Sequence, residues 1–257
     1  MKENIIKGIM TDILENKGKK SAFEVFLEGE NINLKLLSGS GEVEQIRNQV
    51  FNKYLNANFG ETWSLLLPLT HIAAVNVLVR SLELGTIPVN LVGHIGEYPK
   101  VDYTAIVPTQ LYNALTADDH LLKHLQSAKG VLVGGAALTS ELHTQATNAG
   151  ITVVTTYGMS ETSGGCVYNG VPLEGVQVAI SDAGFIKVSG PVLASNLDLD
   201  AQNWFVTSDR GELVDGHLIV LGRGDDVIIS GGENISLIEI ENAISQTFSN
   251  FEFAAFA

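Results

Sequence analysis

Cysteine, basic residues and long apolar runs are all scarce in this sequence. The single cysteine among the 257 residues, Cys166, cannot form an internal disulfide, and its glycine-rich surroundings lack the spacing of a metal site. No apolar run reaches the roughly 20 residues that a bilayer crossing requires, and residues 1–20 are charged and amphipathic rather than a signal peptide. We therefore expect a soluble, cytoplasmic protein with no membrane partner.

Acidic residues outnumber basic ones. The chain has 29 Asp and Glu residues against 15 Lys and Arg residues, which gives a formal net charge of -14. A surface of this sign repels phosphate backbones, so we expect no nucleic acid partner, and any nucleotide must be bound locally by loops and helix ends. With 45% hydrophobic residues, the chain is long enough to bury one large core, or one core plus a smaller unit.

Residues 63–154 alternate short apolar runs with segments of helical period. This pattern is typical of parallel strands joined by crossover helices. The expected strands span residues 63–67, 87–92, 103–107, 130–133 and 151–155. The expected helices span residues 71–84, 109–115 and 139–149, the last with Thr139 as its N-cap. The sequence therefore predicts an α/β fold in which a layered, mostly parallel sheet is flanked by helices.

Glycine, asparagine and aspartate punctuate the sequence after residue 164. The expected strands of a small β-rich subdomain span residues 176–180, 185–188, 204–206 and 217–221. Residues 222–234 contain four glycines and two adjacent aspartates, which favour a hinge and turn over a regular element. A helix at residues 236–248 and an apolar run at residues 251–257 indicate the start of a small α+β C-terminal domain that is cut off. The predicted domains are residues 1–164, 165–222 and 223–257.

Two stretches place glycines or polar groups at the ends of expected strands. In GVLVGGAAL, residues 130–138, a strand runs into two glycines before a helix. Backbone could approach a flat ligand closely there, but a tight strand-to-helix turn explains the glycines better when they are taken alone. ITVVTTYGMSETSGG, residues 151–165, is more specific, because it concentrates polar chemistry where an α/β sheet usually binds its ligand.

Individual side chains of this second stretch suit a nucleotide. Tyr157 could stack on a base, and Ser160 and Thr162 could donate hydrogen bonds to phosphate oxygens. Glu161 could bind a magnesium ion through its hard carboxylate oxygens. A polar loop that caps the next element is the alternative interpretation.

Two later stretches contain polar side chains that could bind a sugar, and the second of them also contains a candidate flexible joint. In TSDRGEL, residues 207–213, Asp209 follows an expected strand and could accept hydrogen bonds from two sugar hydroxyls, although an aspartate in a turn is usually only a turn residue. In LGRGDDVIISGGENIS, residues 221–236, Arg223 could pair with a ribose or phosphate oxygen, and Asp225 begins a flexible joint. Each stretch alone is weak evidence, and the order and separation of the stretches carry the argument.

In this order, GGAAL, YGMSET, SDRGEL and GRGDDVIISGGENI resemble the successive signature segments of acyl-CoA synthetases and other adenylate-forming enzymes, over residues 63–244. Two further strings, LPLTHIAAVNVLVRSLELGTIPV and TYGMSETSGGCVYNGVPLEGV, make the chain most similar to the o-succinylbenzoate:CoA ligases of menaquinone biosynthesis, especially their short actinobacterial form. The resemblance implies a ligase that uses ATP and magnesium (Mg2+) to convert an aromatic carboxylic acid into an acyl-adenylate. Coenzyme A then takes the acyl group. A homodimer is compatible with this resemblance.

The resemblance also implies which residues bind the nucleotide. The implied nucleotide-binding residues are Gly134, Gly135, Ala136, Tyr157, Gly158, Ser160, Asp209 and Arg223. Within this set, Tyr157 packs by the adenine and Ser160 contacts the α-phosphate. Asp209 binds the ribose hydroxyls, with support from Arg223.

Catalysis, acid binding and domain movement are implied for a second set of residues. His71, Ser160 and Glu161 are implied to be catalytic, and Glu161 is implied to bind the metal. The implied residues of the acid pocket are His71, Ser163, Gly164 and Gly165. A lone histidine at a helix start is otherwise more often a cap or a buried hydrogen-bonding group. Asp225 is implied to be the hinge about which the last domain rotates.

Two features depart from the family pattern. The family's phosphate loop is rich in Ser, Thr and Gly and is followed by Pro and Lys, whereas the corresponding string here is LLSGSGEVEQ, residues 36–45. Residues 38–41 could be a remnant of that loop, but the lysine is absent, and Glu42 and Glu44 add repulsive charge. The family's catalytic lysine belongs to the remainder of the C-terminal domain, and this chain has no position to assign to it. We therefore expect weak or absent ATP turnover.

Two other classes of protein compete with the ligase. One is a non-enzymatic relative that keeps the fold and binds adenylate or a partner protein, and ATP-dependent pyrophosphate exchange would separate it from a ligase. The other is a dinucleotide-dependent oxidoreductase. It is disfavoured, because it would require GxGxxG directly after an early strand and SGSGEVEQ contains only the start of that pattern.

Overall fold

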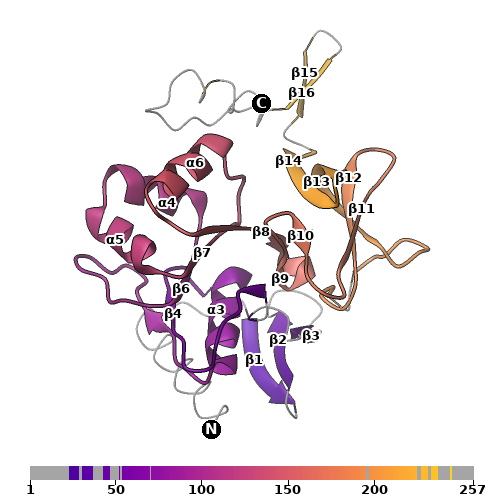
Figure 1. Cartoon of the computed structure of the whole chain (residues 1–257). Helices are drawn as coiled ribbons and strands as arrows, with labels where there is room; N and C mark the ends of the chain where they lie inside the picture. The colour runs from indigo at the N-terminus through magenta and orange to yellow at the C-terminus, as the bar shows by residue number, and fades with distance from the viewer. Residues whose placement is uncertain are drawn as a thin grey trace.

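The computed structural model describes residues 52, 54–69, 71–194, 197–224 and 244, together with the backbones of five strands outside these ranges (Figure 1). Those five strands are β1 (Phe23–Glu28), β2 (Asn31–Leu36), β3 (Val43–Ile46), β15 (Val227–Ser230) and β16 (Glu233–Ser236). The first three form an antiparallel sheet in the order β1-β2-β3.

A seven-stranded sheet in the order β10-β9-β8-β7-β6-β4-β5 forms the centre of the described structure. Its strands are β4 (Trp63–Leu65), β5 (Val89–Asn90), β6 (Tyr103–Ile106), β7 (Gly130–Val133), β8 (Val153–Met159), β9 (Gly164–Tyr168) and β10 (Val171–Pro172). The strands from β5 to β8 pair in parallel, and β9 and β10 add two antiparallel strands at one edge. The predicted α/β fold with a mostly parallel sheet is confirmed.

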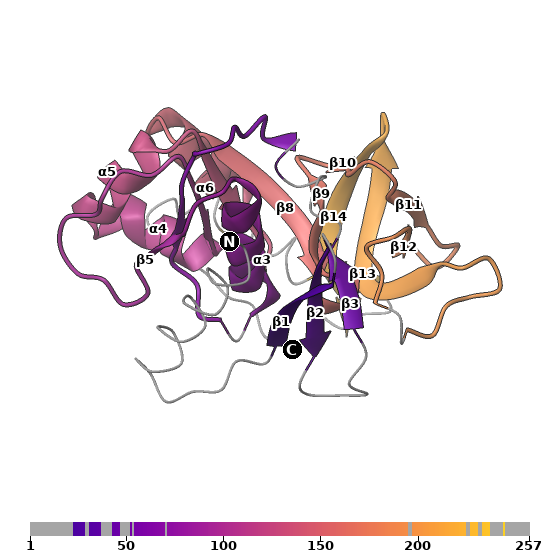
Figure 2. The same ribbon diagram turned by 90° about the horizontal axis from the view of Figure 1, so that it is seen from below.

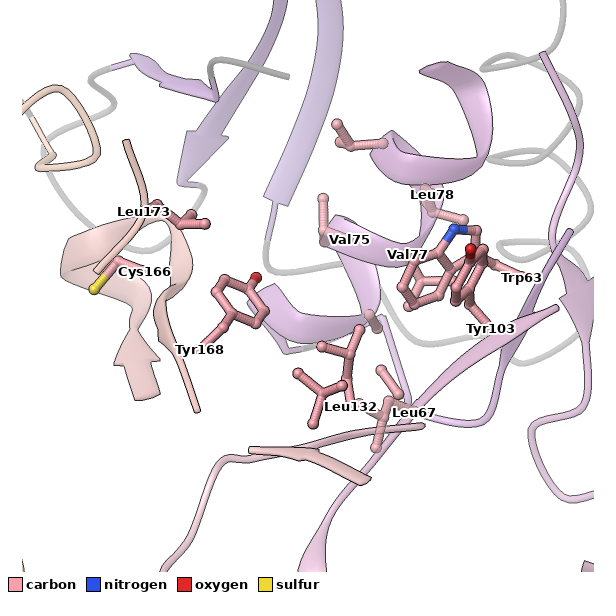
Figure 3. Close-up of a cluster of buried hydrophobic side chains, with 14 of the residues drawn as sticks. Trp63, Leu67, Val75, Val77, Leu78, Tyr103, Leu132, Cys166, Tyr168 and Leu173 are labelled. Carbon is pink, nitrogen blue, oxygen red and sulfur yellow. The ribbon is translucent and has the colours of Figure 1, made fainter. Parts of the chain in front are cut away.

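Helices cover both faces of this sheet, as the continuous apolar runs of its strands require. The helices are α3 (Ile72–Glu83), α4 (Pro108–Thr116), α5 (Asp119–Ser127) and α6 (Ser140–Asn148). On one face α3 packs with Trp63 and Leu132, as Figure 3 shows. On the other face α4, α5 and α6 pack against Val131 and Val133. Neighbouring residues of β7 therefore belong to opposite halves of the core.

Three of these helices correspond to the expected ones, each within one residue at either end. Thr139 is the N-cap of α6, because its hydroxyl accepts a hydrogen bond from the Leu142 amide at 3.2 Å. Helix α5 lies outside the expected elements. Asp118 caps it by accepting from the Leu121 amide at 2.9 Å, but only a few apolar residues mark its buried face, so its periodicity in the sequence is weak.

A four-stranded antiparallel sheet lies beside β8, β9 and β10 in both Figure 1 and Figure 2. Its strands are β11 (Gln177–Ile180), β12 (Phe185–Ser189), β13 (Phe205–Val214) and β14 (His217–Arg223). β13 is longer than the expected strand, because it continues through SDRGEL, and its register with β14 shifts between Arg210 and Gly211. A Cβ on Gly211 would lie 2.7 Å from Ile186 Cγ1 and 2.8 Å from the Ile219 oxygen. This glycine therefore permits close strand packing instead of forming a turn.

β15 and β16 form an antiparallel hairpin in which Ser230 is opposite Glu233. The prediction that residues 222–234 are better suited to a turn than to a regular element is therefore wrong where the two strands form, and the hinge at Asp225 stays a prediction. Their β-branched Val-Ile-Ile run favours a strand, and the two glycines that follow it suit a two-residue hairpin connection. Of the expected helix at residues 236–248, Ser236 ends β16 and Ile244 is helical, and the rest lies outside the described residues.

The chain enters the four-stranded sheet at Gln177, after β9 and β10 have paired within the seven-stranded sheet. The division into domains at residues 164/165 and 222/223 stays a prediction.

None of the described helices is both long enough and apolar enough to cross a membrane.

Candidate functional site

The YGMSET segment forms a tight connection between β8 and β9. β8 is longer than the expected strand at residues 151–155 and carries Tyr157 and Gly158 within it. A single 3-10 turn, Ser160–Thr162, follows directly, and Ser163 then adopts a left-handed conformation with φ of 55°. β9 returns antiparallel to β8. We refer to residues 160–164 as the 160–164 turn.

Hydrogen bonds to neighbouring residues and segments fix the backbone of the 160–164 turn. The Met159 amide donates to Thr162 Oγ1 at 2.9 Å, and the Ala194 amide donates to the Glu161 carbonyl at 2.9 Å. Ser163 Oγ donates to the Val192 carbonyl at 3.0 Å. The Thr162 side chain is fully buried, so its hydroxyl stabilises the turn and does not face a phosphate. Ser160 and Glu161 are partly exposed on this fixed backbone.

Glycines allow the backbones at this site to come into close contact. A Cβ on Gly158 would collide with the Gly164 carbonyl oxygen, and a Cβ on Gly134 would collide with the Thr156 hydroxyl. Gly134 therefore packs the end of β7 against β8. Gly135 and Ala136 follow it as exposed residues. Because β7 and β8 are parallel neighbours, GGAAL and YGMSET lie at the same carboxyl edge of the sheet, where α/β proteins bind ligands.

Tyr157 and Asp209 join this sheet edge to the four-stranded sheet. The Tyr157 hydroxyl donates to Asp209 Oδ2 at 2.8 Å. Burial raises the pKa of the Tyr157 hydroxyl above its ordinary value, and the Asp209 carboxylate adds to this effect, so the phenol stays protonated. Asp209 on β13 is directly opposite Arg223 on β14. The structure therefore brings together the residues that the sequence predicted for base and ribose.

Helix α3 lies against the same turn. Asn76 Nδ2 donates to the Ser163 carbonyl at 2.9 Å, and a Cβ on Gly164 would lie 3.5 Å from Ile72 Cγ1. His71 is the exposed N-cap residue just before Ile72, and its side chain makes no capping hydrogen bond. The predicted acid-pocket residues, at positions 71 and 163–165, thus lie where α3 begins and the 160–164 turn ends.

Sequence reasoning missed two polar residues of α3. Arg80 is 5% exposed, and its Nη2 donates to the Tyr168 hydroxyl at 2.7 Å. Tyr168 in turn donates to the Gly165 carbonyl at 3.3 Å, which connects Arg80 to the predicted acid pocket. Asn76 is 1% exposed. The sequence does place a carboxamide and a guanidinium inside an otherwise apolar helical run. This pattern could have indicated specific buried contacts, because such groups are buried only with specific partners.

Cys166 takes no part in the candidate chemistry. Its side chain on β9 is fully buried within the core cluster shown in Figure 3. Burial raises the pKa of the Cys166 thiol to about 11, so the thiol stays protonated and is a poor nucleophile.

Other features lie apart from this site or outside the described residues. A groove of about 900 Å³ opens between α6, the start of β8 and β14, but it contains none of the predicted site residues. Within the described part of the chain, no group of three or more His, Cys, Asp or Glu side chains could hold a metal ion. The predicted hinge residue Asp225 and the phosphate-loop remnant at residues 38–41 lie outside the described residues.

Comparison with known proteins identifies relatives over most of the chain. Residues 40–213 match the family model of AMP-binding enzymes. A probable 2-succinylbenzoate–CoA ligase of Mycobacterium tuberculosis is 40% identical over 205 residues, which cover 71% of this chain and 53% of the relative. The 2-succinylbenzoate–CoA ligase of Haemophilus influenzae is 30% identical over 207 residues, with 72% and 45% covered. The chain thus spans about half the length of the curated relatives it matches.

Solved structures share the fold. Wild-type MenE of Escherichia coli with a bound analogue of OSB-AMS superposes with a TM-score of 0.62 at 25% identity, over 86% of this chain and 53% of that one. O-succinylbenzoate coenzyme A synthetase of Bacillus subtilis in complex with ATP and magnesium ion gives a TM-score of 0.66 at 22% identity, over 91% and 60%. With the family match over residues 40–213, the chain belongs to the AMP-binding enzymes.

Proposed function

We propose that this chain is an ATP-dependent acid–CoA ligase that activates o-succinylbenzoate, an aromatic carboxylic acid, in menaquinone biosynthesis. The hydrogen bond between Tyr157 and Asp209 carries the proposal, because it brings the predicted base-binding and ribose-binding segments to one sheet edge. The 40% identity to a probable 2-succinylbenzoate–CoA ligase supports this choice of acid.

The nucleotide binds between the two sheets in this proposal. The adenine lies between the Tyr157 ring and the exposed backbone of residues 134–136. Ribose hydroxyls donate to Asp209, whose carboxylate has lone pairs beyond the one that accepts from Tyr157. Arg223, opposite Asp209 on β14, supports the sugar from the neighbouring strand.

The 160–164 turn holds the groups for the phosphates. Ser160 donates to the α-phosphate, and Glu161 supplies a carboxylate oxygen for Mg2+. A single carboxylate fits this ion, because magnesium is commonly held by one or two carboxylates together with substrate phosphates. When bound, magnesium neutralises the charge that develops on the phosphates. The Ala194 amide donates to the Glu161 carbonyl, so the backbone that carries this carboxylate is fixed.

The acid binds on the α3 side of the turn. Its floor is the glycine-rich segment at residues 163–165, and His71 lies at its entrance. One oxygen of the acid carboxylate attacks the α-phosphorus, and the bond to pyrophosphate breaks. The thiol sulfur of coenzyme A then attacks the acyl carbonyl, and AMP leaves with the bonding electron pair.

The alternative of a non-enzymatic adenylate-binding relative has less support. Relatives from Mycobacterium tuberculosis, Haemophilus influenzae and Escherichia coli, at 30–40% identity, carry ligase names. The missing phosphate-loop lysine is a departure in the sequence, and a turnover measurement tests its effect.

Pyrophosphate exchange with o-succinylbenzoate tests the proposal. Glu161→Gln should lower the exchange rate by about 100-fold or more, because a charged group that acts in the transition state is lost. Glu97→Gln removes an exposed carboxylate in a distant loop and should leave the rate unchanged. Absence of any acid-dependent exchange from the folded wild-type chain would contradict the ligase, and AMP binding measured by calorimetry would then support the adenylate-binding alternative.

A further inference from the structure

Asn76 is a buried carboxamide at a position where the helical pattern calls for an apolar side chain. It lies in α3 among the buried residues Val75, Val77 and Leu78 and is 1% exposed. Burying an amide is unfavourable unless hydrogen bonds replace those made with water. The residue is therefore expected to have a specific partner.

That partner is the backbone of the 160–164 turn. Asn76 Nδ2 donates to the Ser163 carbonyl at 2.9 Å, across 87 residues of sequence. Ser163 has the left-handed φ of 55° that non-glycine residues rarely adopt. The same amide also fits the next residue sterically, because a Cβ on Gly164 would collide with Asn76 Nδ2. Hydrogen bonding and shape thus both fix the end of the turn against α3.

The carboxamide is only half satisfied within the described structure. Asn76 Oδ1 is buried and has no hydrogen-bond partner among the described residues. An unpaired buried acceptor is unfavourable, so a favourable contact elsewhere in the same side chain must offset it. The Nδ2 bond to Ser163 is therefore the contact that justifies an asparagine at this position.

A second hydrogen bond connects Ser163 to the part of the turn that carries Ser160 and Glu161. The Ser163 amide donates to the Ser160 carbonyl at 3.0 Å, which closes the 3-10 turn that carries Glu161. We propose that Asn76 is a positioning residue that fixes the 160–164 turn so that the Glu161 carboxylate meets the metal of magnesium–ATP. This inference rests on the proposed function, because it assigns Asn76 a role in the same site.

The test compares the affinity for ATP with and without magnesium. Calorimetry gives the Kd of ATP in EDTA and in excess Mg2+. We call the Kd in EDTA divided by the Kd in excess Mg2+ the magnesium ratio. This ratio reports on the metal-binding carboxylate. Asn76→Leu keeps the approximate shape but removes the donor. Its ratio should fall by about three- to tenfold, the effect of one lost hydrogen bond, while the Kd in EDTA stays within about twofold of wild type.

Asn52→Leu is the matched control. Asn52 is also buried, its Nδ2 donates to the Arg80 carbonyl at 3.2 Å, and its Oδ1 has no partner among the described residues. This variant loses a comparable buried amide at the other end of α3. It should lower the melting temperature without changing the magnesium ratio, so a purely structural effect is distinguished from positioning.

Asn76→Asp supplies a second variant. An ionised carboxylate would repel the Ser163 carbonyl, whereas a protonated one donates to it. Burial raises the pKa of such an acid, so the magnesium ratio should recover as the pH is lowered from about 8 to about 6. Wild type should show no such recovery.

The outcomes separate this inference from the proposed function. A wild-type magnesium ratio in Asn76→Leu, or an equal loss in Asn52→Leu, would overturn the positioning role while nucleotide binding stands. A ratio near one in the wild type would show that Glu161 binds no metal and would also overturn it. Failure of the wild-type chain to bind ATP under either condition would overturn the proposed function and this inference together.

Discussion

Tyr157 and Asp209 are 52 residues apart in the sequence and lie in different sheets, yet their side chains share a hydrogen bond. Because burial raises the pKa of Tyr157, its hydroxyl remains a donor at all pH values at which a protein of this kind is handled. The bond holds the Asp209 carboxylate in one orientation. In the proposed function, the tyrosine would contribute to nucleotide binding through its hydroxyl as well as through its ring.

Tyr157→Phe tests the part played by the hydroxyl. We expect it to weaken AMP binding by about three- to tenfold, because a charge-assisted hydrogen bond that orients Asp209 is lost while the ring remains. Calorimetric titration with AMP measures the change. Tyr112→Phe, on helix α4, is the control and should bind AMP as wild type does. Unchanged affinity in Tyr157→Phe would show that the hydroxyl does not orient the ribose-binding carboxylate.

At the scale of elements, His124 joins α5 to two strands of the seven-stranded sheet. The Pro99 carbonyl can only accept a hydrogen bond, so His124 Nδ1, at 2.9 Å, must donate to it. In the neutral ring Nε2 then accepts from Ser64 Oγ at 3.0 Å, and Ser64 Oγ is 2.7 Å from Thr104 Oγ1. Burial lowers the pKa of His124 below its ordinary value of 6.5. The folded protein thus favours the neutral imidazole.

This network predicts a loss of stability in mild acid. Above about pH 6.5 the His124 ring is neutral in the folded and in the unfolded protein. Below this pH the unfolded chain takes up a proton first, because the pKa of His124 is lowered in the folded state. The free energy of unfolding therefore falls as the pH drops toward that lowered pKa. Urea unfolding at a series of pH values measures this. His124→Gln should lower stability at neutral pH by about 1–3 kcal/mol, because buried hydroxyls lose a partner, and should flatten the pH dependence.

His120→Gln is the control, because His120 is an exposed residue of the same helix. It should keep the wild-type slope of stability against pH. A slope in His124→Gln as steep as in the wild type would show that another group titrates.

The parallel strands could be predicted from the sequence because short apolar runs between glycines are local signals. β13 could be predicted only in part. An Asp-Arg-Gly string indicates a turn, whereas here Gly211 lies within a strand, at a position where a side chain would meet Ile186. α5 was missed because its buried face depends on a few residues, such as Leu121 and Leu125. These elements are set by packing with distant strands, which a local pattern does not contain.

Of the residues at the candidate site, some could likewise be predicted from local sequence patterns and others could not. Tyr157 and Asp209 were identifiable because their segments carry recurring patterns, and the structure brings them together. Asn76 and Arg80 were missed because their partners, Ser163 and Tyr168, lie 87 and 88 residues away. Only the fold places α3 against the 160–164 turn. Their roles therefore could not follow from a helix that appears in the sequence as a core element.

At the scale of the whole molecule, the two sheets share a hydrophobic core and are also joined by hydrogen bonds. The cluster that contains α3 and β9 also contains Ile186 and Val188 of the four-stranded sheet. The Tyr157–Asp209 bond lies at the edge of this contact. A nucleotide that binds the tyrosine side with its base and the aspartate side with its ribose would therefore hold both sheets together.

AMP should accordingly raise the melting temperature of the chain. At a free concentration about 100 times its Kd, a ligand that binds only the folded state adds about 2.7 kcal/mol, which corresponds to roughly 5–10 °C for a chain of this size. Differential scanning calorimetry measures the shift. Asp209→Asn should lose most of it at the same AMP concentration, because the ribose loses its carboxylate acceptor. A wild-type chain that AMP does not stabilise, or an Asp209→Asn chain stabilised equally, would show that the nucleotide does not bridge the sheets through this residue.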